Sequence, residues 1–207
     1  MITSYNELPI GKFVEFTHIP YEGREEVDYM LDIVSLLSDK TVDELSVMPI
    51  TEFSSLCAKT HFLQHMPEVG HRRIEKVRLG SWNLRVTKGA KYMQTNQYVD
   101  FQNFIQQGND AIVQQLSCIL IPEGMKYCEG YDVADLQKAI AEMPTQTALD
   151  VQAFFLRRSL SSIVSTLISL EWTSHFLKNG KEIRTMIREE RKHLQEAFRQ
   201  SGAGSMP

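Results

Sequence analysis

The chain is poor in the residues that mark a disulfide framework, and it has no long hydrophobic run. Its three cysteines, Cys57, Cys118 and Cys128, form no CxxC pair, and such an odd, scattered set indicates reduced thiols in a cytosolic compartment. No uncharged run is longer than that of residues 159–170, whereas a helix needs roughly 20 apolar residues to cross a bilayer. We therefore expect free thiols and no membrane segment.

Sequence motifs of catalysis are also missing. The chain contains no G-x-S-x-G, no P-loop and no G-x-G-x-x-G, which are signatures of hydrolases and nucleotide-binding enzymes. Adjacent acids such as Glu189 and Glu190 do not face each other on a helix, so they make no carboxylate pair. Cys128 lies near Lys126 in a predicted loop, without a histidine positioned to activate it. These features predict a protein that is not an enzyme and has no cofactor.

Two histidines have a spacing that can bind zinc. His61 and His65 are four residues apart, which places them on one face of a helix, and His71 follows closely. No glutamate stands inside the pair as in H-E-x-x-H, and no CxxC completes a tetrahedral site. Exposed histidines near a helix end are the commoner explanation, so we predict no metal.

Charge is unevenly distributed along the chain. The net charge is −4, but residues 1–70 carry −8 and residues 71–91 carry +6. The basic residues of the second segment are Arg72, Arg73, Lys76, Arg78, Arg85, Lys88 and Lys91. Such segregation indicates that the basic segment folds onto the acidic part or faces an acidic partner.

The strongest periodic signal lies in residues 149–177, which contain neither glycine nor proline. Apolar residues recur every seven positions there, with others at the alternate positions, as on a helix that buries a continuous seam. The seven-spaced residues are Leu149, Leu156, Ile163, Leu170 and Leu177. We expect this helix to be an inner strut of the core.

Shorter helices are predicted along the rest of the chain from caps, breakers and apolar spacing. A hairpin at about 73–87 is the only strand signal: apolar residues alternate on both sides of Gly80-Ser81. The expected helices cover residues 4–19, 25–37, 41–48, 49–65, 95–107, 110–121 and 132–143.

The expected fold is mainly α. It comprises a multi-helix domain at 1–179 with a β-hairpin inserted at 71–91, a projecting amphipathic helix at 180–200, and a disordered tail at 201–207. With 43% hydrophobic residues, a chain of this length normally buries well over half of its unfolded surface.

Three sets of residues are candidates for binding. The C-terminal helix carries an apolar stripe amid many charges, typical of a partner-binding or oligomerising element: Ile183, Ile187, Leu194 and Phe198. Tyr98, Phe101 and Phe104 form a second set, for which core packing is the commoner explanation. The hairpin has the basic footprint of a nucleic-acid or acidic-partner site, although the whole chain is acidic: Arg72, Arg73, Arg78, Arg85 and Lys88.

Three blocks, read in order, resemble a known group of proteins. They are YNELPIGKFVEF with DIVSLLSDKTVDELSVMPITEFSSLCAKTHFL, then the basic hairpin leading to TNQYVDFQNF, and finally LSCILIPEGMKYCEGYDVADLQKAI with ALDVQAFFLRRSL. The order resembles tail assembly chaperones of gut-bacterial phages and prophages, encoded next to the tape-measure gene. The resemblance covers about residues 5–175 and leaves out the helix at 181–199.

The resemblance implies a function in virion assembly in the host bacterial cytoplasm. A tail assembly chaperone coats the long, aggregation-prone tape-measure protein until tail-tube subunits polymerise around it, and a homo-oligomer is compatible with that role. One alternative is a structural virion component, such as a head–tail connector or ring protein, which stays in the particle. A less favoured alternative is a nucleic-acid-binding regulator that uses the basic hairpin.

Overall fold

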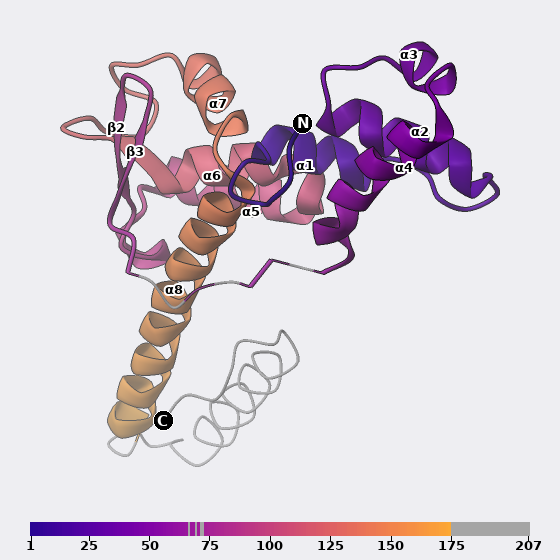
Figure 1. The fold of residues 1–207 in the computed structure, drawn as a ribbon. Helices are drawn as coiled ribbons and strands as arrows, with labels where there is room; N and C mark the ends of the chain where they lie inside the picture. Colours follow the sequence, from indigo (N-terminus) through magenta and orange to yellow (C-terminus); the bar gives the residue numbers. More distant parts are fainter. Residues whose placement is uncertain (66, 69, 71–72, 175–207) are drawn as a thin grey trace. The chain divides into compact units, whose positions relative to one another are not determined.

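The computed structural model describes residues 1–65, 67, 68, 70 and 73–174. The chain divides into two compact units, Met1–Phe155 and Leu156–Pro207. In the second unit the described residues, 156–174, continue the long helix α8 (Thr145–Ser174). Helices and one small sheet make up the described residues (Figure 1), which confirms the predicted mainly α fold with its hairpin. The segments predicted at 180–200 and 201–207 lie outside this description.

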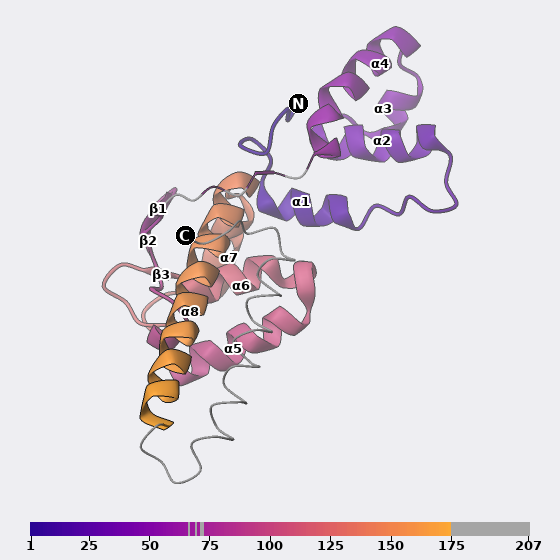
Figure 2. The ribbon, with the colours of Figure 1, turned by 90° about the horizontal axis from the view of Figure 1, so that it is seen from below.

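Four short helices open the first unit. They are α1 (Ile10–Thr17), α2 (Glu26–Leu37), α3 (Val42–Ser46) and α4 (Ile50–Lys59), which continues into a 3-10 turn at Thr60–Gln64. Helices α2, α3 and α4 pack together around a small cluster of their own (Figure 2), formed by Val34, Leu45 and Phe53.

The start of α3 is fixed by a local signal that the sequence shows clearly. The Glu44 N–H donates to Thr41 Oγ1 at 3.3 Å, and the Thr41 N–H donates to Glu44 Oε2 at 2.7 Å. Two of the N–H groups that lack a partner at the helix start are thereby satisfied, as in a capping box. The predicted capping box is confirmed.

The first helix begins later than predicted. Instead of starting near Ser4, it starts at Ile10, and residues 5–7 form a turn. Leu8 precedes a proline, which disfavours helical backbone at that residue. Its carbonyl oxygen instead accepts from the Thr145 N–H and from Thr145 Oγ1, both at 2.7 Å. This long-range contact, together with a bridge between Pro9 and Pro144, sets the start of α1.

Helix α6 (Ile112–Ile119) lies at the centre of the first unit. It contacts α1, α5 (Thr95–Gln106) and α7 (Val133–Ala141). Short 3-10 turns at Ala90–Tyr92 and Gly108–Ala111 lead into α5 and α6. The predicted cap of α7 is confirmed, since Asp132 Oδ1 accepts from the Ala134 N–H at 2.7 Å.

The hairpin is present, but it belongs to a three-stranded antiparallel sheet in the order β1-β2-β3. Strands β1 (Lys76–Leu79) and β2 (Trp82–Val86) are joined by Gly80-Ser81. Gly80 has a φ of +53°, the left-handed conformation required at the first position of a type II′ turn.

The third strand corrects the helix predicted at 110–121. Helix α6 ends at Ile119, and β3 (Leu120–Pro122) pairs with β2, placing Leu84 opposite Pro122 and Val86 opposite Leu120. Periodicity does not separate a short apolar strand from the end of a buried helix. Pairing with a distant strand decides the outcome, and Pro122 fits because it lies on an edge strand.

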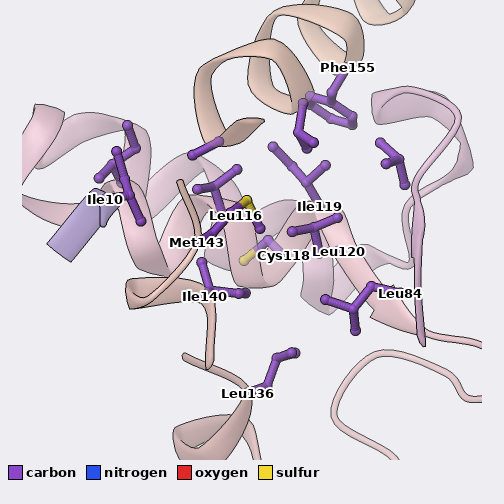
Figure 3. Packing of buried hydrophobic residues seen from close by; sticks show 14 of the residues in the cluster. Ile10, Leu84, Leu116, Cys118, Ile119, Leu120, Leu136, Ile140, Met143 and Phe155 are labelled. Carbon is purple, nitrogen blue, oxygen red and sulfur yellow. The ribbon is translucent and has the colours of Figure 1, made fainter. Parts of the chain in front are cut away.

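The main core gathers around α6, where side chains from α1, β2, β3, α7 and α8 meet (Figure 3). Its largest fully buried members include Leu116, Ile119, Leu120, Leu136, Ile140, Met143 and Phe155. Since deleting a buried leucine or isoleucine side chain costs about 2–5 kcal/mol, this cluster dominates the stability of the first unit.

Helix α8 is present, but it does not bury the predicted seven-residue seam. In the first unit its buried apolar residues are Ala148, Val151, Phe154 and Phe155. Leu149 is only partly buried, and Leu156 is 40% exposed. The face follows the three-and-four spacing set by Phe155, which packs edge-on against Phe101 of α5 at 5.2 Å between ring centroids. The side chains of Ile163 and Leu170, and all of Leu177, lie outside the description.

Candidate partner-binding surface

Buried polar and aromatic contacts fix the rotation of α5. Gln97 Nε2 donates to the Cys118 carbonyl oxygen at 2.6 Å and to Thr87 Oγ1 at 3.3 Å. Phe101, one turn further, packs against Phe155. Because these side chains are buried in the unit, the opposite side of α5 faces outward.

The outward side of α5 is uncharged and carries three exposed apolar side chains among polar ones. Tyr98, Val99 and Ile105 are 44%, 50% and 41% exposed. At 100° per residue they share one half of the helix with Thr95, Gln102 and Gln106. The only charged residue of α5 is Asp100, which accepts a hydrogen bond from Tyr127 Oη at 2.9 Å. Depletion of charge together with exposed aromatic residues is typical of the centre of a protein interface.

The three aromatic residues that were predicted as a second binding set therefore lie in two different environments. Phe101 belongs to the core and Phe104 packs against it, whereas Tyr98 is on the outward side. Val99 and Ile105 were missed as surface residues. The sequence feature that could have identified them is the lack of any charge at the positions that share their side of the helix.

A buried polar chain lies beneath α5. The Cys118 thiol is 3.4 Å from Tyr127 Oη, which donates to Asp100. Burial raises the pKa of the Cys118 thiol to about 11, and it also raises the pKa of Tyr127. Because the thiolate is the nucleophilic form, Cys118 is a poor nucleophile at neutral pH. Cys128, by contrast, is exposed, on a backbone with a φ of +58°.

The basic side chains of the hairpin are partly neutralised within the sheet. The strand register puts Lys76, Arg78 and Arg85 on one face. Lys76 Nζ lies 2.6 Å from Glu123 Oε1, and Arg85 donates to the Met125 carbonyl oxygen at 3.2 Å.

The other basic residues of the segment differ in whether they have an acidic partner. Arg73 Nε donates to Glu75 Oε1 at 2.8 Å, whereas the side chains of Arg78 and Lys88 are exposed and have no ion-pair partner among the described residues. Arg72 is outside the description. Arg78 and Lys88 are thus available to a partner on this surface.

The basic segment does not neutralise the acidic N-terminal part. None of the ion pairs between described residues joins an acid of residues 1–70 to a base of residues 73–91. Arg24 pairs with Asp32 inside the acidic part, and His18 pairs with Asp110. Two oppositely charged surfaces remain on one unit.

The remaining predicted sites fall as follows. The apolar stripe of Ile183, Ile187, Leu194 and Phe198 lies outside the described residues. The His61 and His65 rings are edge-on, with 5.9 Å between their centroids. Over the described residues, no three histidine, cysteine or acidic side chains gather as a metal site would require. Within the same residues no helix has the length and apolarity to cross a bilayer.

Comparison with protein-family models, with curated proteins and with solved structures gives no match.

Proposed function

We propose that this protein is a non-enzymatic bacteriophage assembly protein, a tail assembly chaperone that binds the tape-measure protein in the bacterial cytoplasm. Two observations support the proposal. Three blocks of the sequence resemble such chaperones, and α5 presents Tyr98, Val99 and Ile105 on an uncharged outward side. The second observation carries the physical argument, because it supplies a surface of the required kind.

A chaperone of a long helical protein needs apolar contact that is later displaced. Burying apolar surface gives about 25 cal/mol per Å², and association opposes this with lost translational and rotational freedom. A face with only three exposed apolar side chains therefore favours weak, reversible binding. Several copies along an elongated partner then cover much of it without a tight contact at any one place.

The experiment is co-expression with the neighbouring tape-measure protein. We expect the wild-type chain to raise the soluble fraction of the tape-measure protein, and the Tyr98→Glu/Ile105→Glu variant to lose most of that effect. Glutamate is a good helix former, so α5 remains intact while two charges enter its uncharged outward side. The Ile187→Asp/Leu194→Asp variant tests the predicted C-terminal stripe in the same assay.

Val27→Glu is the matched control. Val27 is 58% exposed on α2, so the change introduces a glutamate in place of an apolar residue at a comparable exposure on another helix, one charge against the two of the α5 variant, and we expect full chaperone activity. Thermal melting of each variant shows whether it is folded. If both the α5 variant and the C-terminal variant keep the tape-measure protein soluble, neither surface is the contact and the proposal fails.

A further inference from the structure

An apolar knob with acidic neighbours projects where α3 meets α4. Val47 is 84% exposed and Ile50 is 73% exposed. Asp43 and Glu52, in the first turns of the two helices, are exposed as well. Residues 22–52 carry nine acids against two bases. Two exposed aliphatic side chains therefore lie close to several acids in the sequence.

A hollow of about 320 Å³ lies at the turn end of the sheet. Trp82, Pro122 and Met125 give it apolar walls, and Ser81, Asn83 and Glu123 complete the lining. A cavity of about 150 Å³ takes a benzene molecule, so this hollow has room for an aliphatic side chain.

The surroundings of the hollow are basic. Arg78 lies opposite Asn83 in the strand register, Lys76 pairs with Glu123, and Arg85 donates to the carbonyl oxygen of Met125. Residues 73–91 carry six bases against one acid. The basic residues beside the hollow therefore have the opposite charge to the acidic residues beside the knob.

We propose that the knob of one copy, Val47 and Ile50 with their acidic surroundings, docks into the basic hollow of a second copy of this chain. Both surfaces belong to the first unit, and their charges do not neutralise each other within the described monomer. Since the two surfaces differ, the contact is heterologous and propagates head to tail. It gives a ring if the rotation between copies closes and an open stack if it does not.

Charge-swap variants of the full chain test this contact. Asp43→Lys/Glu52→Lys makes the knob side basic, and Arg78→Glu/Arg85→Glu makes the hollow side acidic. We expect wild-type chain to self-associate at low salt in sedimentation equilibrium, and each variant alone to bind itself at least about tenfold more weakly, since interfacial charges of like sign oppose each other. An equimolar mixture of the two variants has one native pair of surfaces, so association returns.

The control is Asp135→Lys/Glu142→Lys, in which Asp135 lies in the first turn of α7, Glu142 follows its last residue, and both are exposed. It carries the same net charge as the knob variant and is expected to self-associate like the wild type. Ile50→Ser, which changes no charge, is expected to weaken self-association. Wild-type chain that stays monomeric at low salt overturns the proposal, and so does a mixture that does not restore association. Binding of nucleic acid at Arg78 and Lys88 without self-association also overturns it. These outcomes do not depend on the tape-measure protein, so they are separate from the test of the proposed function.

Discussion

Cys118 and Cys128 carry the same thiol in opposite surroundings. Cys118 is buried beneath α5, next to Tyr127, and Cys128 is exposed in the loop before α7. Burial penalises the charged thiolate, which raises the pKa of Cys118 from 9.0 to about 11. The difference in surroundings turns one cysteine into part of the core and leaves the other open to reagents.

The raised pKa of Cys118 predicts a loss of stability at alkaline pH. In the unfolded chain the thiol ionises near pH 9, whereas in the fold it stays protonated until about pH 11. Its contribution to the free energy of unfolding is thus fully present below pH 9 and is lost as the pH rises toward 11. Urea unfolding under reducing conditions at pH 8 and pH 10.5 measures this loss.

The matched variants are Cys118→Ala and Cys128→Ala. We expect Cys118→Ala to lose less stability between the two pH values than the wild type does, and Cys128→Ala to lose as much as the wild type. Tyr127, whose pKa is also raised by burial, continues to lower the stability at alkaline pH in all three proteins. An equal pH dependence in wild type and Cys118→Ala contradicts the account of this residue.

At the scale of elements, neighbouring positions on α8 differ in their surroundings. Phe155 is fully buried against Phe101, and Leu156 is 40% exposed. We expect Phe155→Ala to lower the free energy of unfolding by about 3–5 kcal/mol and Leu156→Ala to change it by about 0.5 kcal/mol or less. Urea unfolding of both variants provides the measurement. A larger loss for Leu156→Ala than for Phe155→Ala would instead support the seven-residue seam.

Elements whose limits are set within a few residues were predictable from the sequence. The capping box at Thr41 and Glu44, the Asp132 cap and the Gly80-Ser81 turn all rest on contacts inside one turn of chain. The start of α1 and strand β3 were not predictable, because Thr145 and β2 decide them from far along the chain.

The candidate surface was predictable only in part, for a similar reason. Tyr98 and Phe101 are both aromatic residues of one helix, and only the contacts of Gln97 and Phe101 with distant residues show which side faces the core. The uncharged character of the other side, from Thr95 to Gln106, was readable in the sequence. The predicted seven-residue seam of α8 was wrong because the apolar residues of this helix fit two overlapping faces. The contact of Phe155 with Phe101 determines which of the two faces is buried.

At the scale of the whole molecule, segregation of charge and apolar surface is the main feature. The acidic helices α2 and α3 and the basic strands β1 and β2 belong to one unit, yet no described ion pair joins them. Exposed apolar side chains stand on α5 and at the junction of α3 and α4. A molecule of this kind is suited to binding other protein chains, with charge setting orientation and apolar contact supplying affinity.

The most direct test of the central claim, transient binding to the tape-measure protein, is quantitative mass spectrometry of phage-producing cells and of the particles they release. The account predicts that this protein co-purifies with the tape-measure protein before tails assemble and is absent from finished particles. Its presence in finished particles in stoichiometric amount, or its absence from the tape-measure protein at every stage, would contradict the account.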